Sequence, residues 1–331
     1  MTRADELQIA MSCSGTNAYR YGTIKPHILS LTLVLADGSI VKTRNRPRKS
    51  SAGYDLTSLV IGSEGTLALV TEAVLKITPL PKNPHVGLAT FSTMQHGVDV
   101  AIAILQSGTQ LEALELADAH CMRAIQASGL VNDEYAERPT LFLKFAGSAQ
   151  NVREQISFVE DLCAEHGALG IEFTSEKARM DGIWSARKVL GHALVCMKKA
   201  PSDLFLSTDA AVPVSLLARL VSQSEEIVRS ADESWFCASV GHVGDGNVHT
   251  AVVCPDQDRE KAEELLERIQ RLALELEGTI TGEHGIGLKL RDLLGEEVGE
   301  LGVGLMRKIK VAMDPRGILN PDKVVRLEVG V

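Results

Sequence analysis

Up to residue 84, short runs of aliphatic and β-branched residues alternate with turn-forming residues, a pattern that predicts β-strands. Strands are expected at 28–35 and 40–43, joined through Asp37-Gly38, a dipeptide typical of tight hairpin turns. A second β block is expected at 59–61 and 67–77, with a glycine-rich turn between its two parts. Prolines at 79, 81 and 84 then interrupt regular structure, which indicates a domain boundary near residue 84.

Beyond this boundary, helical and strand patterns alternate. Helices are expected at 98–105, 111–127, 152–166, 183–197, 213–227, 260–277 and 301–313, and strands at 140–145, 171–174, 204–206, 235–240 and 248–254. In the helix at 152–166, for example, Ile156, Val159 and Leu162 recur at the spacing of one helix face. Strands mixed with helices long enough to cover a sheet indicate an α+β or α/β fold.

Composition limits the classes of function. The 331 residues are 45% hydrophobic, with a mean hydropathy of +0.05, so the chain can bury a full core. The net charge is −9 and the pI is about 5.5. Basic residues gather only at 44–49, with four positive charges, which is typical of a solvated turn. The sequence therefore does not predict a nucleic-acid-binding surface.

Cysteine usage and the absence of long apolar runs bear on the compartment. The six cysteines form no Cys-x-x-Cys pair, which indicates reduced thiols in an intracellular protein. No apolar run reaches the ~18 residues of a transmembrane helix. The acidic opening at 1–7 resembles neither a signal peptide nor a transit peptide.

The most informative segment is Gly-His-Val-Gly-Asp-Gly-Asn-Val-His at 241–249, where two histidines flank a glycine-rich loop between expected strands. Such a loop folds the chain back, so His242 and His249 can end side by side. Paired imidazoles suit a divalent metal, with Zn–N bonds of about 2.0–2.1 Å. The alternative is a hairpin whose histidines are simply polar residues near a turn. The spacing is not a common zinc spacing, so both interpretations stay open.

A second segment, Thr-Gly-Glu-His-Gly-Ile-Gly at 281–287, places an acid and an imidazole between glycines, which allow close backbone approach to a ligand. Glu283 is a candidate third, anionic metal ligand, and His284 is a candidate general base. The alternative is a helix C-cap and a turn with His284 exposed. Two histidines and a carboxylate from two glycine-rich loops together match an open three-ligand metal site.

Other candidates are weaker. Arg187 lies on an expected helix and could grip a carboxylate, although an exposed arginine is the ordinary alternative. Turns at 14–17 and 62–66 could offer backbone N–H groups to a phosphate, but neither is a P-loop or a G-x-G-x-x-G fingerprint. Asn320, which precedes a proline, is equally a turn former.

Together these segments occur in the order of a known family. The chain resembles the D-lactate dehydrogenase (cytochrome) group of the flavin-binding family that includes vanillyl-alcohol oxidase. The motifs that carry the resemblance lie at 14–22, 49–56, 61–67, 241–249, 281–287 and 314–324. It implies an α+β fold, with part of a PCMH-type FAD-binding domain at 1–84. An antiparallel-sheet-and-helices substrate domain at 85–331 would follow, its last segment returning to the flavin.

The resemblance also implies residue roles. His242, His249 and Glu283 would hold zinc or manganese, His284 would take the substrate's hydroxyl proton, and Arg187 would orient its carboxylate. Asn247 would line the same pocket. The residues that would contact FAD are Ser14, Gly15, Asn17, Tyr21, Gly22, Gly62, Glu64, Gly65, Thr66 and Asn320. The implied reaction is oxidation of a D-2-hydroxy acid, with D-lactate to pyruvate expected first. Hydride would pass to the flavin and electrons to cytochrome c in mitochondria.

Two departures from the family pattern qualify this expectation. The family has an earlier, glycine-rich half of its flavin domain, which does not precede residue 13 here. The chain therefore looks truncated, and weak or absent flavin binding is expected. The 2-hydroxyglutarate relatives place a lysine before an aspartate where this chain has Thr208-Asp209, which favours a short monocarboxylate. The alternatives are a D-2-hydroxyglutarate or glycolate dehydrogenase, or an inactive metal-binding fragment.

Overall fold

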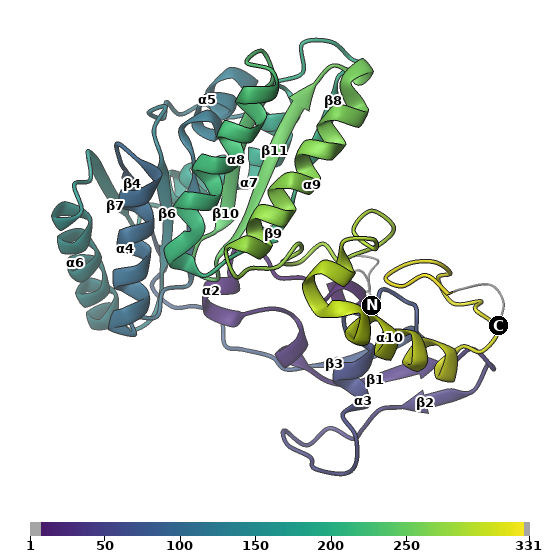
Figure 1. The fold of residues 1–331 in the computed structure, drawn as a ribbon. Coiled ribbons are helices and arrows are strands. Elements are labelled where there is room, and N and C mark those ends of the chain that lie inside the picture. Colours follow the sequence, from purple (N-terminus) through teal and green to yellow (C-terminus); the bar gives the residue numbers. More distant parts are fainter. Residues whose placement is uncertain (1–7, 328–331) are drawn as a thin grey trace. The chain divides into compact units, whose positions relative to one another are not determined.

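A computed structural model describes residues 8–327, so the opening segment to which we assigned no targeting peptide lies outside the described residues. The chain divides into two compact units (Figure 1). Unit 1 comprises Met1–Gly15, Gly22–Pro79 and Ile280–Val331, and unit 2 comprises Thr16–Tyr21 and Leu80–Thr279. The sequence indicates a boundary near residue 84, and in the structure the long segment of unit 1 ends at Pro79.

Unit 1 is built on a three-stranded antiparallel sheet in the order β2-β1-β3. Its elements are η1 (Lys25–His27), β1 (Ile28–Val34), β2 (Ile40–Lys42), α3 (Leu56–Val60), β3 (Leu69–Leu75) and α10 (Leu294–Met313). The expected hairpin turn joins β1 to β2, where Gly38 has a φ of 85° and the Asp37 carboxylate accepts the Ser39 N–H at 2.9 Å. Aliphatic residues of β1 and α3, including Leu31 and Val60, form its core.

Unit 2 is built on an antiparallel sheet that, within the described residues, has eight strands. Their order is β7-β4-β6-β5-β10-β11-β8, with β9 also paired to β11. The strands are β4 (His85–Thr90), β5 (Ala113–Ala117), β6 (Thr140–Phe145), β7 (Gly170–Thr174), β8 (Leu204–Ser207), β9 (Ala210–Ala211), β10 (Phe236–His242) and β11 (Asn247–Cys254). The hairpin of β10 and β11 therefore lies well inside the sheet, with β5 beside it.

Helices cover both faces of this sheet (Figure 1). The helices of unit 2 are α2 (Ala18–Tyr21), α4 (Met94–Ser107), α5 (Ala119–Ser128), α6 (Ala149–Glu165), α7 (Lys177–Val195), η2 (Val214–Leu216), α8 (Leu217–Ala231), η3 (Asp256–Asp258) and α9 (Arg259–Glu275). Buried side chains of α4, α6, α8 and α9 pack on one face, and those of α5 and α7 pack on the other. Each fully buried large aliphatic side chain contributes roughly 1.5–3 kcal/mol. The predicted α+β class is confirmed.

Some elements expected from the sequence are wrong. Residues 59–60, expected in a strand, belong to the short helix α3, which begins because the Asp55 side chain caps the N–H of Ser58. Strand β4 was not expected. The last helix begins at Leu294 rather than residue 301, with a break at Gly299, where φ is 74°.

The largest error concerns 111–127, expected as one helix. It contains strand β5, then Asp118, then helix α5. Alanine, leucine and glutamate in this segment all favour helix, but β5 lies between β6 and β10, whose backbone groups it satisfies. Asp118 separates the two elements, because its carboxylate accepts the N–H of Cys121 at 2.7 Å and that of Ser239 at 2.6 Å. Tertiary pairing therefore overrides local propensity here.

The partly buried lysine of β6, Lys144, gives a testable prediction. Burial, and secondarily the charge of Lys188, lowers the pKa of Lys144 to about 8, even though its Nζ lies 3.6 Å from the ring centre of Trp184. Amine-directed labelling of Lys144 is therefore expected to reach half its maximal rate near pH 8, below the ~10.4 of an ordinary lysine. Because the folded state holds fewer protons than the unfolded state between these values, stability should also rise with pH there.

Mass spectrometry of tryptic fragments after brief acetylation at several pH values measures this profile. A Lys144→Arg variant identifies the fragment and should lose the early labelling. Half-maximal labelling of Lys144 near pH 10 would show that the Trp184 ring compensates for the burial.

Candidate metal and substrate site

His242 and His249 project from the same face of the β10–β11 hairpin. The strand register pairs His249 with Val240, and paired residues of an antiparallel sheet point to the same face. His242 lies two residues after Val240, so it points to that face as well. The two imidazole centroids lie 5.8 Å apart, with the rings perpendicular. Because both rings lie on one face, the hairpin allows them to share a metal ion.

The glycines of the 241–249 motif are explained by backbone crowding. A Cβ on Gly241 would lie 2.1 Å from the Asn247 carbonyl oxygen, and one on Gly246 would lie 2.0 Å from the Val212 carbonyl oxygen. Gly246 also has a φ of 80°, which side-chain-bearing residues rarely adopt. The motif therefore specifies a tightly packed hairpin, which fixes the direction of both histidines.

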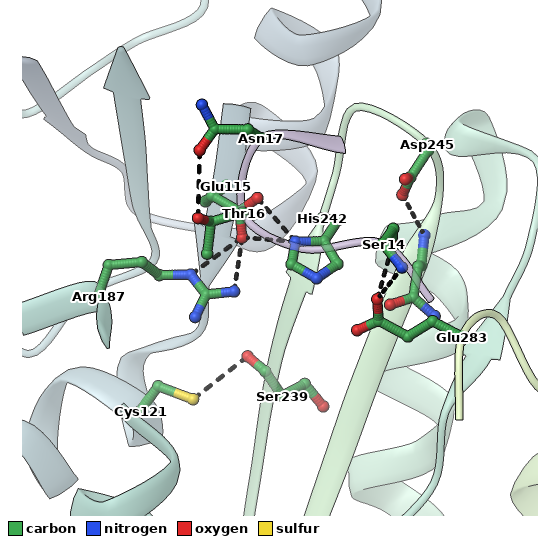
Figure 2. A network of polar contacts seen from close by, with 11 residues as sticks. Ser14, Thr16, Asn17, Glu115, Cys121, Arg187, Ser239, His242, Asp245 and Glu283 are labelled. Atoms are coloured by element: carbon green, nitrogen blue, oxygen red, sulfur yellow. Dashed lines mark hydrogen bonds and ion pairs between the residues drawn. The ribbon is translucent and has the colours of Figure 1, made fainter. Parts of the chain in front are cut away.

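Glu115 of β5 contacts both His242 and Arg187 (Figure 2). His242 Nδ1 lies 2.7 Å from Glu115 Oε1 and 2.9 Å from Oε2, and Arg187 donates to Oε2 from Nε at 3.0 Å and Nη2 at 2.5 Å. Glu115 is 1% exposed, His242 is 4% exposed and Arg187 is 8% exposed. Because water is largely excluded, the three charged or polar groups depend on one another.

Asp209 lies beside His249, in a looser contact than that between Glu115 and His242. Its Oδ1 lies 3.4 Å from His249 Nδ1 and accepts the Asn247 side-chain N–H at 2.8 Å. Asn247 Nδ2 also donates to the Ala210 carbonyl, at 3.2 Å. The opposite atom, Asn247 Oδ1, is buried and, among the described residues, has no hydrogen-bond partner. An orphaned buried acceptor is costly in a folded protein, so Asn247 Oδ1 remains a candidate to meet a ligand.

These contacts form a polar row across one face of the sheet. It runs from Glu115 on β5 through His242 on β10 and His249 on β11 to Asp209 beside β9. Two imidazoles with a carboxylate beside each are typical of a metal centre, where an outer carboxylate fixes the ring that binds the ion, and here Glu115 is hydrogen-bonded to His242 while Asp209 lies 3.4 Å from His249. The prediction that His242 and His249 are ligands remains a prediction, supported by this arrangement.

Arg187 was expected to orient a substrate carboxylate, with an exposed arginine as the ordinary alternative. The exposed alternative is wrong, because Arg187 is buried and paired with Glu115. The role toward a substrate stays a prediction.

In unit 1, Glu283 is held by the segment around Ser14 (Figure 2). Glu283 Oε2 accepts the Ser14 backbone N–H at 3.0 Å and the Ser14 hydroxyl at 2.5 Å. The Cys13 thiol donates to the Glu283 carbonyl at 3.1 Å. A carboxylate oxygen of Glu283 and a ring nitrogen of the exposed His284 lie within 4.8 Å of each other, as do Asp209 and His249 within unit 2. Each unit thus carries one acid–imidazole pair.

A cavity of about 700 Å³ in unit 1 is lined in part by three of the flavin candidates. Gly62, Glu64 and Thr66 line it, together with Thr281, Gly282, Glu283, Gly285 and Ile286 of the second motif. The Glu64 carboxylate accepts the N–H groups of Ile286 at 2.6 Å and Gly287 at 2.8 Å, and its carbonyl accepts the Asn320 side-chain N–H at 2.5 Å. Glu64 therefore joins three motifs that are far apart in sequence.

A buried ion pair fastens the wall of this cavity. Lys310 Nζ donates to Asp314 Oδ2 at 2.5 Å, to the Thr66 carbonyl at 2.8 Å and to the Leu319 carbonyl at 2.7 Å. Burial raises the pKa of Asp314, but the Lys310 ammonium and the backbone N–H groups of Leu319 and Ile318 outweigh it and leave that pKa below its ordinary value. The pair fixes the loops before Leu67 and around Leu319.

The remaining flavin candidates are less informative. Ser14 and Gly15 precede the segment Thr16–Tyr21 that belongs to unit 2, and Gly22, with a φ of 70°, follows it. Asn17 accepts the Thr16 hydroxyl at 3.4 Å. Tyr21 donates to Glu112 at 2.9 Å, and its pKa is raised by burial and by that carboxylate. The described residues that line the cavity do not include Gly65, Asn320 or the 14–22 segment. Their roles toward FAD stay predictions.

Sequence reasoning missed Glu115 and Asp209. The expected helix at 111–127 gave Glu115 no special significance. On the observed strand β5, Glu115 is a single acid among buried apolar residues. In the sequence, Asp209 served only to locate Thr208, the position of a lysine in the 2-hydroxyglutarate relatives, and no metal role was assigned to Asp209. A strand assignment for 113–117 would have marked Glu115 as a buried charge that needs partners.

Comparison with known proteins places the chain in a family. The family described as FAD linked oxidases, C-terminal domain, matches residues 80–324. The chain is 42% identical to the mitochondrial D-lactate dehydrogenase [cytochrome] of Kluyveromyces lactis, over 97% of this chain and 56% of that protein. It is 31% identical to a D-lactate dehydrogenase of Archaeoglobus fulgidus, over 96% of this chain and 69% of that protein. It spans about half the length of the first of these relatives.

Solved structures support the same fold. p-Cresol methylhydroxylase with substrate bound superposes with a TM-score of 0.72 at 12% identity, covering 92% of this chain and 66% of that one. In the part of the chain that the structure describes, no helix is long and apolar enough to cross a membrane. The chain belongs to the family of FAD linked oxidases, of which it carries the C-terminal domain, and it is similar over nearly its whole length to D-lactate dehydrogenases.

Proposed function

We propose that this chain carries the metal and substrate residues of an FAD-dependent dehydrogenase that oxidises a D-2-hydroxy acid, with D-lactate to pyruvate as the first reaction to test. The observation that carries the proposal is the row of two imidazoles and two carboxylates, buried except for the partly exposed His249, beside the unsatisfied Asn247 oxygen. The similarity to D-lactate dehydrogenases supports this choice of substrate class.

His242, His249 and Glu283 would hold a divalent metal, zinc or manganese, and Asp209 would join them as a ligand or as the carboxylate that orients His249. The donor set suits such an ion, since imidazole and carboxylate are ligands common to zinc and manganese sites. The fit is supported within unit 2 by His242, whose Nδ1 is engaged by Glu115. In a neutral ring this arrangement presents Nε2 as the electron-pair donor.

The chain's own residues would position the substrate and move its proton. Arg187 would attract the substrate carboxylate, and Asn247 Oδ1 would accept a hydrogen bond, which satisfies its buried oxygen. His284 would take the proton of the 2-hydroxyl. When bound, the flavin supplies an acceptor for the hydride on carbon 2, and the metal supplies positive charge that lowers the pKa of the hydroxyl. The substrate then leaves as the 2-oxo acid, with its O–H proton on His284.

The cavity of unit 1 is the proposed flavin-binding region. Gly62, which lines the cavity, has a φ of 82°, a conformation that favours glycine, so no side chain projects from this position toward a planar ring. Leu59, Ile61 and Leu67 supply apolar wall, which suits the dimethylbenzene edge of a flavin. Electrons would pass on to cytochrome c in mitochondria, a proposal drawn from the names of the relatives. An absorbance spectrum of the purified protein with added FAD tests whether this region binds flavin.

Substrate size also follows from the site. Thr208 precedes Asp209, is buried, and accepts the Thr250 N–H at 3.3 Å, so no cation stands there for a second carboxylate. We propose a preference for D-lactate over D-2-hydroxyglutarate, with glycolate as the smaller competitor. Turnover of these three acids by the protein in excess added FAD, with a dye acceptor, tests the proposal. Faster turnover of D-2-hydroxyglutarate would assign the other substrate class, and no turnover of any would favour a metal-binding protein without this activity.

Replacing Glu283 by glutamine is expected to weaken metal binding by about 10- to 100-fold, because a neutral amide is a poorer ligand for a dication. Glutamine can still accept the two hydrogen bonds from Ser14, so the local fold should be kept. Equilibrium dialysis with Mn²⁺ or Zn²⁺ measures the change. Glu277→Gln, which alters an acid four residues before the motif, is the control. Equal metal affinity in Glu283→Gln and wild type would remove Glu283 from the ligand set.

A further inference from the structure

Glu115 is a buried charge that, in the proposed reaction, neither binds the metal nor meets the substrate itself. It lies at the centre of β5, whose five residues are all buried, and its side chain is 1% exposed. An isolated carboxylate is strongly disfavoured in such a place, so its retention requires partners. Both partners, His242 and Arg187, belong to the set of residues proposed to meet metal or substrate.

The geometry of Glu115 determines what His242 can do. Carboxylate oxygens only accept hydrogen bonds, so the ring nitrogen 2.7 Å from Oε1 must carry a proton. That nitrogen is Nδ1, which in a neutral imidazole makes Nε2 the electron-pair donor. At the same time Oε2 accepts both Nε and Nη2 of Arg187, which fixes the plane of the guanidinium.

We propose that Glu115 is a positioning residue of this site: it selects the Nδ1–H tautomer of His242 for metal binding and holds Arg187 in place for the substrate carboxylate. This inference rests on the proposed function, since both partners act through a metal or a substrate. Strand pairing supports it, because Gly241↔Leu116 and Val240↔Ala117 bring β5 alongside β10 in a register that sets Glu115 next to His242.

A merely structural ion pair exists on the same helix and provides a comparison. Near the start of α7, Arg179 donates to Glu172 of β7 from Nε at 2.6 Å and Nη2 at 2.7 Å. Like Glu115, Glu172 joins α7 to the sheet through an arginine, but β7 is the edge strand, and the ion-pair partners of Arg179 among the described residues are the carboxylates of Glu172 and Asp133. Glu172→Gln therefore removes a helix–sheet pair without touching the polar row.

The test compares wild type, Glu115→Gln and Glu172→Gln in the intact chain. Mn²⁺ or Zn²⁺ affinity is measured by equilibrium dialysis, and folding by thermal unfolding. Histidine tautomers are measured by ¹H–¹⁵N NMR of the metal-free, histidine-labelled protein, with His242→Gln to assign the signal. We expect Glu115→Gln to bind metal about 10–100-fold more weakly and Glu172→Gln to bind like wild type. The wild-type His242 signal should be that of the Nδ1–H form.

The outcomes separate this inference from the proposed function. Unchanged metal affinity in Glu115→Gln, or equal weakening in Glu172→Gln, would overturn the positioning role while the metal site stands. An Nε2–H signal for His242 in wild type would overturn it as well, even if Glu115→Gln does not fold. Failure of the wild type to bind either metal would overturn the metal part of the proposed function, and the positioning role with it.

Discussion

Replacing His284 by alanine is expected to lower kcat for D-lactate by about 10²–10⁴-fold, the usual contribution of a positioned general base. His284 is exposed and follows Glu283 in a loop whose form is fixed by glycines, since a Cβ on Gly285 would lie 2.7 Å from Glu64 Oε1. If His284 acts only as the base, metal content should remain at the wild-type level. The measurement pairs steady-state kinetics in excess added FAD with metal analysis of the same sample.

The metal analysis decides between two roles for His284. Its ring nitrogen lies within 4.8 Å of the Glu283 carboxylate, close enough for both to bind one ion. Loss of metal together with activity in His284→Ala would assign it as a ligand, and the proton would then pass to another group. Normal turnover would remove it from the mechanism altogether. His192→Ala, at an exposed position on α7, serves as the matched control and should behave like wild type.

Replacing Asp314 by asparagine is expected to reduce the free energy of unfolding by about 3–5 kcal/mol, because it leaves the buried Lys310 ammonium without its counter-ion. The side chains of Lys310 and Asp314 are 4% and 0% exposed, so water cannot take the place of the carboxylate. Urea unfolding at neutral pH measures the loss. The double variant Lys310→Met with Asp314→Asn should recover part of it, since it removes the buried charge.

An exposed pair at the same helical spacing is the control. Lys177 and Asp181 lie 2.6 Å apart with side chains 83% and 66% exposed, so Asp181→Asn should cost no more than about 1 kcal/mol. A loss in Asp314→Asn no larger than in Asp181→Asn would contradict the prediction.

Acid should affect the same pair. Because the pKa of Asp314 is below its ordinary value in the folded chain, its contribution is present above about pH 4 and is lost as pH falls through the folded-state pKa. Asp314→Asn should lack this part of the acid-induced loss of stability.

Sequence alone determined the candidate motifs and most of the secondary structure. Gly241 and Gly246 are needed for a hairpin so tight that any side chain would collide with backbone, so the turn between His242 and His249 could be recognised from residue types. The periodic helices at 152–166 and 260–277 likewise correspond to α6 and α9, because an amphipathic face of that length has few alternatives. The acid–imidazole pair at 283–284 was also visible in the chain.

Only the tertiary structure decided which groups hold these residues in place. Residues 113–117 have the composition of a helix and become a strand because β6 and β10 offer hydrogen bonds on both sides. That pairing brings Glu115 to His242, 127 residues away in the chain. Asp209 reaches His249 in the same way, through β9 and β11. Side-chain partners across a sheet depend on strand order and register, which are set by long-range pairing and leave no periodic signal in the sequence.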